Sequence, residues 1–165
     1  MKFALNPHVL MAHWVPGFLV VMAVRSVLLN VSPLGDCLMG RDNSGEATAI
    51  LSIVVFAFLI GELLDAARDL ILENILDKFQ PLRWSFFSSE DTNKVENFKT
   101  SYYTYYVFDW NVSMALLVVA ALAISYSAPT WTYVVLAISL VIFVSNAIRL
   151  RGEMKPLMEW MSMDL

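Results

Sequence analysis

The chain has 165 residues, of which 58% are hydrophobic and only 16% are charged, and its formal net charge is -4. Soluble domains carry about 25% charged residues, so this composition indicates an integral membrane protein. The acidic balance, without a run of Lys or Arg, excludes nucleic acid as a partner. The single Cys37 excludes an intrachain disulfide and a cysteine-based zinc cluster.

Four long apolar runs occupy most of the chain, at residues 4–24, 47–64, 105–127 and 130–148. Each is close to the ~20 residues that an α-helix needs to cross about 30 Å of hydrocarbon. We therefore predict an all-α integral membrane protein, a bundle of four transmembrane helices embedded in the lipid bilayer. No loop is long enough for a second domain, so residues 1–165 are expected to form one domain.

The local sequence also predicts where the helices begin and end. Asn6 followed by Pro7 is typical of a helix start, and Pro16 inside the first run predicts a kink. The second helix meets no breaker before Pro81, so we expect about 33 residues. The third helix is expected to begin near Val95. Both helices are longer than the bilayer requires, so their ends are predicted to extend into the cytoplasm.

Lys and Arg residues in the short connections predict the orientation. They concentrate between the second and third runs and in the C-terminal tail: Lys78, Arg83, Lys94, Lys99, Arg149, Arg151 and Lys155. The connection between the first two runs is balanced by acidic residues, and the last connection carries no charge. We therefore expect both termini in the cytoplasm, and the protein in a bacterial or archaeal cytoplasmic membrane.

One face of the second helix carries an acidic stripe made of Glu62, Asp65, Asp69, Glu73 and Asp77. At 100° per residue these positions fall within an arc of about 120°. A span of ~20 residues from position 47 leaves Glu62 and Asp65 in hydrocarbon, puts Asp69 at the interface and leaves the last two in water. The alternative is that the helix leaves the membrane near position 61, so that the whole stripe is a solvated extension.

The other helices are expected to bring polar partners to the same depth. The first helix supplies His13, since His8 lies about 140° around the helix and cannot face the same ion. The third supplies Tyr106 and Asp109 on one face. The fourth supplies Asn146 and Arg149. Arg68 of the second helix lies off the acidic arc, and it either binds a substrate or snorkels toward lipid phosphates.

These residues predict one site with three kinds of role. The expected catalytic residues are Glu62, Asp65, Asp109 and Tyr106. The expected substrate-binding residues are Arg149, Arg68 and Asn146. The expected metal ligands are His13, Glu62, Asp65 and Asp69. Carboxylates with an imidazole suit zinc and carboxylates alone suit magnesium, so a divalent metal of either kind is the cofactor that the set predicts.

Ionised groups are costly in hydrocarbon, so an intramembrane cluster of them points to function. The expected function is a membrane-embedded, metal-dependent hydrolase or transferase that acts on a lipid-like substrate at the cytoplasmic leaflet. Two alternatives stay open. One is a homo-oligomeric ion- or proton-conducting subunit with an acidic vestibule. The other is a non-catalytic membrane anchor that assembles with a soluble cytoplasmic partner.

Overall fold

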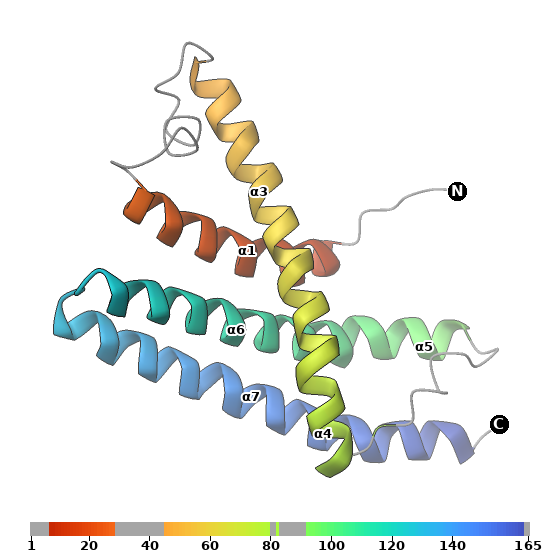
Figure 1. The fold of residues 1–165 in the computed structure, drawn as a ribbon. Coiled ribbons are helices and arrows are strands. Elements are labelled where there is room, and N and C mark those ends of the chain that lie inside the picture. The colour runs from red at the N-terminus through yellow and green to blue at the C-terminus, as the bar shows by residue number, and fades with distance from the viewer. Residues whose placement is uncertain (1–6, 29–44, 80–81, 83–91, 164–165) are drawn as a thin grey trace.

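The computed structural model describes residues 7–28, 45–79, 82 and 92–163, and all secondary structure in these ranges is helical (Figure 1). Two of the four long helices each contain a short stretch of wider π-helix, through which the helix continues. The elements are α1 (Pro7–Leu28); α3 (Gly45–Ala67), η1 (Arg68–Glu73) and α4 (Asn74–Phe79); α5 (Thr92–Phe98), η3 (Lys99–Tyr103) and α6 (Thr104–Ser125); and α7 (Thr130–Met163).

Three of the helices are long and apolar enough to cross a membrane, over Ile50–Phe79, Val95–Ser125 and Thr130–Glu159. The all-helical class is thus confirmed for the described residues, and the three long apolar helices indicate an integral membrane protein. The apolar stretch of α1 is shorter, Met11–Arg25, among the residues that the structure describes. A fourth crossing by α1 therefore stays a prediction.

Helices α1, α6 and α7 form a layer, and the helix made of α3, η1 and α4 crosses it (Figure 1). α6 lies between α1 on one side and an antiparallel α7 on the other, and the α3–α4 helix runs steeply across them (Figure 1). The first turn of α1 and the last turn of α7 lie toward the same side of the molecule, away from the turn that joins α6 and α7. Within the layer, α6 therefore has a neighbour on each of two faces.

The crossing of α1 and α3 depends on two glycines. A Cβ atom at Gly17 would lie 1.8 Å from the carbonyl oxygen of Ala57, and one at Gly61 would lie 2.0 Å from that of His13. Small residues allow two membrane helices to approach until their backbones touch. This contact fixes where α3 crosses α1, and it positions His13 beside the start of the acidic stripe.

The helix ends agree with the sequence in part. α1 begins at Pro7, and the helix that starts as α3 continues to Phe79, as the absence of a breaker before Pro81 indicates. The third helix begins at Thr92, close to the expected Val95. At the C-terminal end, α7 continues through the tail to Met163, with Pro156 inside the helix.

Packing differs sharply along α7. In its first half Val141 and Ile142 are 65% and 60% exposed, which suits a surface that faces lipid tails. In its second half Met154 and Met158 are fully buried, in a core with α5 and α6 residues such as Phe98. Burial of this apolar face explains why the tail is helical, since tertiary packing supplies most of a helix's stability.

Candidate functional site

Helix α6 directs polar side chains to two opposite faces. Asp109 and Asn111 are two residues apart, so their side chains point about 200° away from each other. Asp109 bonds to Asn146 of α7, and Asn111 bonds to Asp65 of α3 and to the carbonyl oxygen of Ala12 in α1. Both α6 side chains are buried. The predicted single site is therefore distributed over two sides of α6.

On the α3 side, Arg68 is held by two carboxylates of its own helix. Its Nη2 and Nε donate to Asp69 Oδ1 at 2.5 and 3.2 Å. Its Nη1 lies 2.8 Å from Asp65 Oδ1, close enough for an ion pair although it is not aligned for a hydrogen bond. Asn111 donates to the same Asp65 oxygen at 3.0 Å and to Ala12 O at 3.1 Å.

The expectation that Arg68 snorkels to lipid phosphates is wrong, because the residue is only 1% exposed. Asp65 lies three residues earlier in the sequence, and i,i+3 side chains are neighbours on a helix surface. The two carboxylates neutralise the guanidinium and engage its donors. A role for Arg68 in binding substrate remains a prediction, and its geometry indicates an internal counter-ion.

His13 and Glu62 form a separate pair where α1 crosses α3. His13 Nδ1 lies 3.5 Å from Glu62 Oε1, which is an ion-pair distance without a hydrogen bond. The Glu62 side chain is half exposed and that of His13 is 15% exposed. The Gly61 contact brings the two together. The side chain of His8 lies outside what the structure describes.

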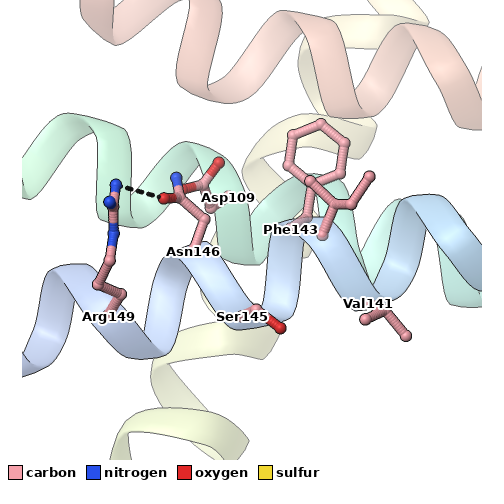
Figure 2. A pocket seen from close by; sticks show the side chains of 7 residues that line it. Asp109, Val141, Phe143, Ser145, Asn146 and Arg149 are labelled. Atoms are coloured by element: carbon pink, nitrogen blue, oxygen red, sulfur yellow. Dashed lines mark hydrogen bonds between the residues drawn. The ribbon is translucent and has the colours of Figure 1, made fainter.

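On the α7 side, an open pocket of about 480 Å³ lies between α6 and α7. Figure 2 shows the polar end of the pocket, where Asn146 lies between Asp109 and Arg149. Asn146 Nδ2 donates to Asp109 Oδ2 at 2.5 Å, and Arg149 Nη2 donates to Asn146 Oδ1 at 2.8 Å. The remaining lining residues are Val141, Ile142, Phe143 and Ser145.

The two ends of this pocket differ in exposure. Asp109 is 5% exposed, whereas the Arg149 side chain is 67% exposed and lies 3.8 Å from Glu153 at its Nε atom. The pocket therefore combines a buried carboxyl group, an accessible guanidinium and an apolar wall. Chemically, this set can hold an anionic group and offer a hydrogen-bond acceptor beside it.

A third cluster centres on Arg151 of α7. Arg151 Nη1 donates to the hydroxyl of Tyr106 at 2.7 Å, and Nη2 pairs with Asp77 of α4. Its guanidinium carbon also lies 5.9 Å from the centre of the Tyr106 ring. Arg151 is 1% exposed and Tyr106 is fully buried. Tyr106 thus binds a protein partner, and a catalytic role for it remains a prediction.

The expected position of Asp77 in open water is wrong, since its side chain is partly buried and bonded to Arg151. The pair was not predicted from the sequence because the two residues are 74 positions apart and meet only in the folded structure. A signal was present, because Arg151, Met154 and Met158 recur at helical spacing and form one side of an amphipathic helix.

The expected metal ligands are not brought together. Among the described residues, no group of three His, Cys, Asp or Glu side chains is placed to hold a metal ion. His13 pairs with Glu62, while Asp65 and Asp69 surround Arg68. The donor set therefore does not fit a zinc or magnesium centre, and no chemical step below depends on a metal.

Comparisons with protein-family models, with curated proteins and with solved structures gave no match. A function for this chain is therefore inferred from its own residues. Of the predicted site residues, Asp109, Asn146 and Arg149 line one pocket together with apolar side chains.

Proposed function

We propose that this chain is a membrane-embedded enzyme that acts on a lipid-like substrate in the pocket between α6 and α7. One observation carries the proposal, namely that a buried carboxyl group, an exposed guanidinium and exposed apolar side chains line the same pocket. Asp109 and Arg149 supply the charges, and Val141 and Ile142 supply the apolar wall. An amphiphile with an anionic headgroup is complementary to this combination.

The depth of the pocket supports a lipid rather than a water-soluble substrate. Arg149 lies 19 residues along α7 from Thr130, which is roughly 28 Å at 1.5 Å per residue. Asp109 lies 16 residues before the end of α6 at Ser125, which is roughly 24 Å. The hydrocarbon core is about 30 Å thick. If the α6–α7 turn lies at one membrane surface, the pocket lies near the headgroups of the other.

The side chains suggest how the substrate is held. A guanidinium binds phosphate and carboxylate oxygens in a fork of two hydrogen bonds, and the exposed Arg149 is placed for this. The acyl chains would lie against Val141 and Ile142, which are exposed on the same side of α7. Asn146 fixes the spacing between the two charges by bonding to both.

In this proposal Asp109 is the general base. Its carboxylate would take a proton from a water or alcohol oxygen as that oxygen attacks the phosphorus or carbonyl carbon of the substrate. Asp109 would then return the proton to the leaving oxygen as the old bond breaks. Attack by water gives hydrolysis, and attack by an alcohol gives group transfer. Asn146 would orient the carboxylate through its hydrogen bond to Oδ2.

The topology follows the same proposal. All four helices would cross the bilayer, with both termini and the pocket at the cytoplasmic face of a bacterial or archaeal membrane. The ends of the second and third helices would extend into the cytoplasm. The distribution of Lys and Arg supports this orientation. The first turn of α1 and the last turn of α7 lie toward the same side of the molecule, which is consistent with this orientation (Figure 1).

The test uses the purified protein in lipid nanodiscs made from a mixture of phospholipids. Wild type should convert one lipid class over time, as followed by mass spectrometry. Asp109→Asn should bind lipid but lose conversion by roughly 10²-fold or more, the usual contribution of a general base. Glu96→Gln, which alters an exposed carboxylate on α5, is the control. Equal conversion by wild type and Asp109→Asn would remove Asp109 from the mechanism.

A further inference from the structure

The pocket presents a positive and a negative group that are separated by a single amide. From this, and resting on the proposed function, we infer the headgroup that the pocket recognises. It is a phosphate that carries a hydrogen-bond donor, an ammonium or a hydroxyl group, within the same headgroup. Arg149 takes the phosphate and one lone pair of the Asp109 carboxylate takes the donor, with the Asn146 amide between them. A carboxylate has about four acceptor sites, so one stays available for the proton of the attacking oxygen.

Asp109 retains an unused acceptor. Its Oδ2 receives the Asn146 hydrogen bond, whereas Oδ1 has no donor among the described residues. The residue is 5% exposed and lines the pocket, so the pocket is where a donor can approach it. The Oδ1 atom itself is open to solvent, so its unused acceptor is accessible to a ligand. A ligand ammonium or hydroxyl group would satisfy it.

Arg149 retains donors at the other end. Its Nη2 bonds to Asn146 Oδ1, and its Nε lies at a long 3.8 Å from Glu153. Within the described residues, Nη1 has no partner, and the side chain is largely exposed. A phosphate can therefore bind at Nη1 without displacing the Asn146 contact that fixes the guanidinium.

The specificity for the headgroup comes from the positions of Arg149 and Asp109 on either side of Asn146. Asn146 turns its oxygen toward Arg149 and its nitrogen toward Asp109, so it holds both groups and keeps them apart. A phosphoethanolamine or phosphoglycerol headgroup has a phosphate that can face Arg149 and a donor that can face Asp109. A phosphocholine headgroup has the same phosphate and the same net charge as phosphoethanolamine but no N–H or O–H donor. Choline is thus the matched control for the contact with Asp109.

The experiment measures lipid binding by native mass spectrometry, with phosphatidylethanolamine, phosphatidylglycerol and phosphatidylcholine of identical acyl chains. Wild type should bind the first two roughly tenfold or more tightly than the third, the factor for a hydrogen bond to a charged group. Asp109→Asn should reduce that preference to within about twofold. Glycerophosphoethanolamine has the same headgroup but lacks acyl chains. If it binds as tightly as phosphatidylethanolamine, the ligand is a free phosphate ester, and if it binds more weakly, the ligand is a membrane lipid.

The outcomes distinguish the two proposals. Arg149→Gln should weaken all three lipids, and its failure to do so would reject the pocket itself. If Arg149→Gln weakens all three while wild type binds phosphatidylcholine as tightly as phosphatidylethanolamine, only the headgroup inference fails. The comparison of lipids on wild type needs no variant, so the inference stays testable even if Asp109→Asn does not fold.

Discussion

Arg151 of α7 donates a hydrogen bond at 2.7 Å to the hydroxyl of Tyr106, which lies 45 residues earlier on α6. Both side chains are almost completely buried, and the same guanidinium pairs with Asp77 of α4. One cation therefore connects three helical segments, α4, α6 and α7. The interaction gives the C-terminal half of α7 a defined position on α6.

Replacing Arg151 with Met should lower the free energy of unfolding by about 1.5–3 kcal/mol, the range for hydrogen bonds to charged groups. The loss should not be larger, because Asp77 is 34% exposed and water can solvate it. Unfolding by denaturant in detergent micelles measures the change. Arg149→Met, at a site that is 67% exposed, is the control and should have little effect on stability. Equal losses from the two variants would contradict a special role for Arg151.

The double variant Arg151→Met with Tyr106→Phe tests whether these residues act together. Since the hydroxyl and the guanidinium share one hydrogen bond, the two losses should not add. A coupling free energy of about 0.5 kcal/mol or more is expected for residues in contact. Strict additivity in the same unfolding experiment would show that the bond contributes nothing to stability.

Gly61→Ala should destabilise the protein by about 1–3 kcal/mol, the usual cost of forcing extra volume into a packed site. The new Cβ would lie 2.0 Å from the carbonyl oxygen of His13, so α1 and α3 must separate. Gly152→Ala is the matched control, since a Cβ added at Gly152 would have no described atom within 4 Å beyond its own stretch of helix. That control should stabilise α7 by about 0.5–1 kcal/mol through its helix propensity. A Gly61→Ala protein with wild-type stability would rule out the close crossing.

Asn111→Ala should also destabilise the protein, by about 1–3 kcal/mol, because it removes a buried donor from Asp65 and from the Ala12 carbonyl. Asn97→Ala, on the exposed side of α5, should change stability very little. Thermal unfolding of the two variants side by side makes the comparison. If the Asn111 variant melts with wild type, the link between α6 and the α1–α3 pair is energetically neutral.

The natural single cysteine tests the proposed orientation. Cys37 lies between the first two apolar runs, which the charge pattern assigns to the outer surface. A membrane-impermeant maleimide added to intact cells should therefore label Cys37. In a Cys37→Ser background, Thr130→Cys should be labelled from outside and Glu153→Cys only after the cells are opened. The reverse pattern would invert the topology and move the pocket to the other leaflet.

The amino-acid sequence alone predicted the helical class, four apolar spans of which three are confirmed as long apolar helices, and several helix ends such as Pro7 and the uninterrupted stretch before Pro81. It did so because hydropathy, helix length and proline effects are local properties of the chain. The 4-3-4 spacing of Tyr102, Tyr106, Asp109 and Ser113 likewise predicts that these residues share one side of a helix, which follows from helical geometry alone.

Which helix each of those faces contacts depends on how the whole bundle packs. Periodicity gives the angle between Asp109 and Asn111, but the neighbours on the two sides of α6 depend on the order in which the helices pack. Because α3 approaches with α1 and α7 packs against the opposite face, Asp65 is separated from Asp109. The partners of Arg68 and Arg151 were decided in the same way, since burying a charge requires a counter-charge in the packed structure.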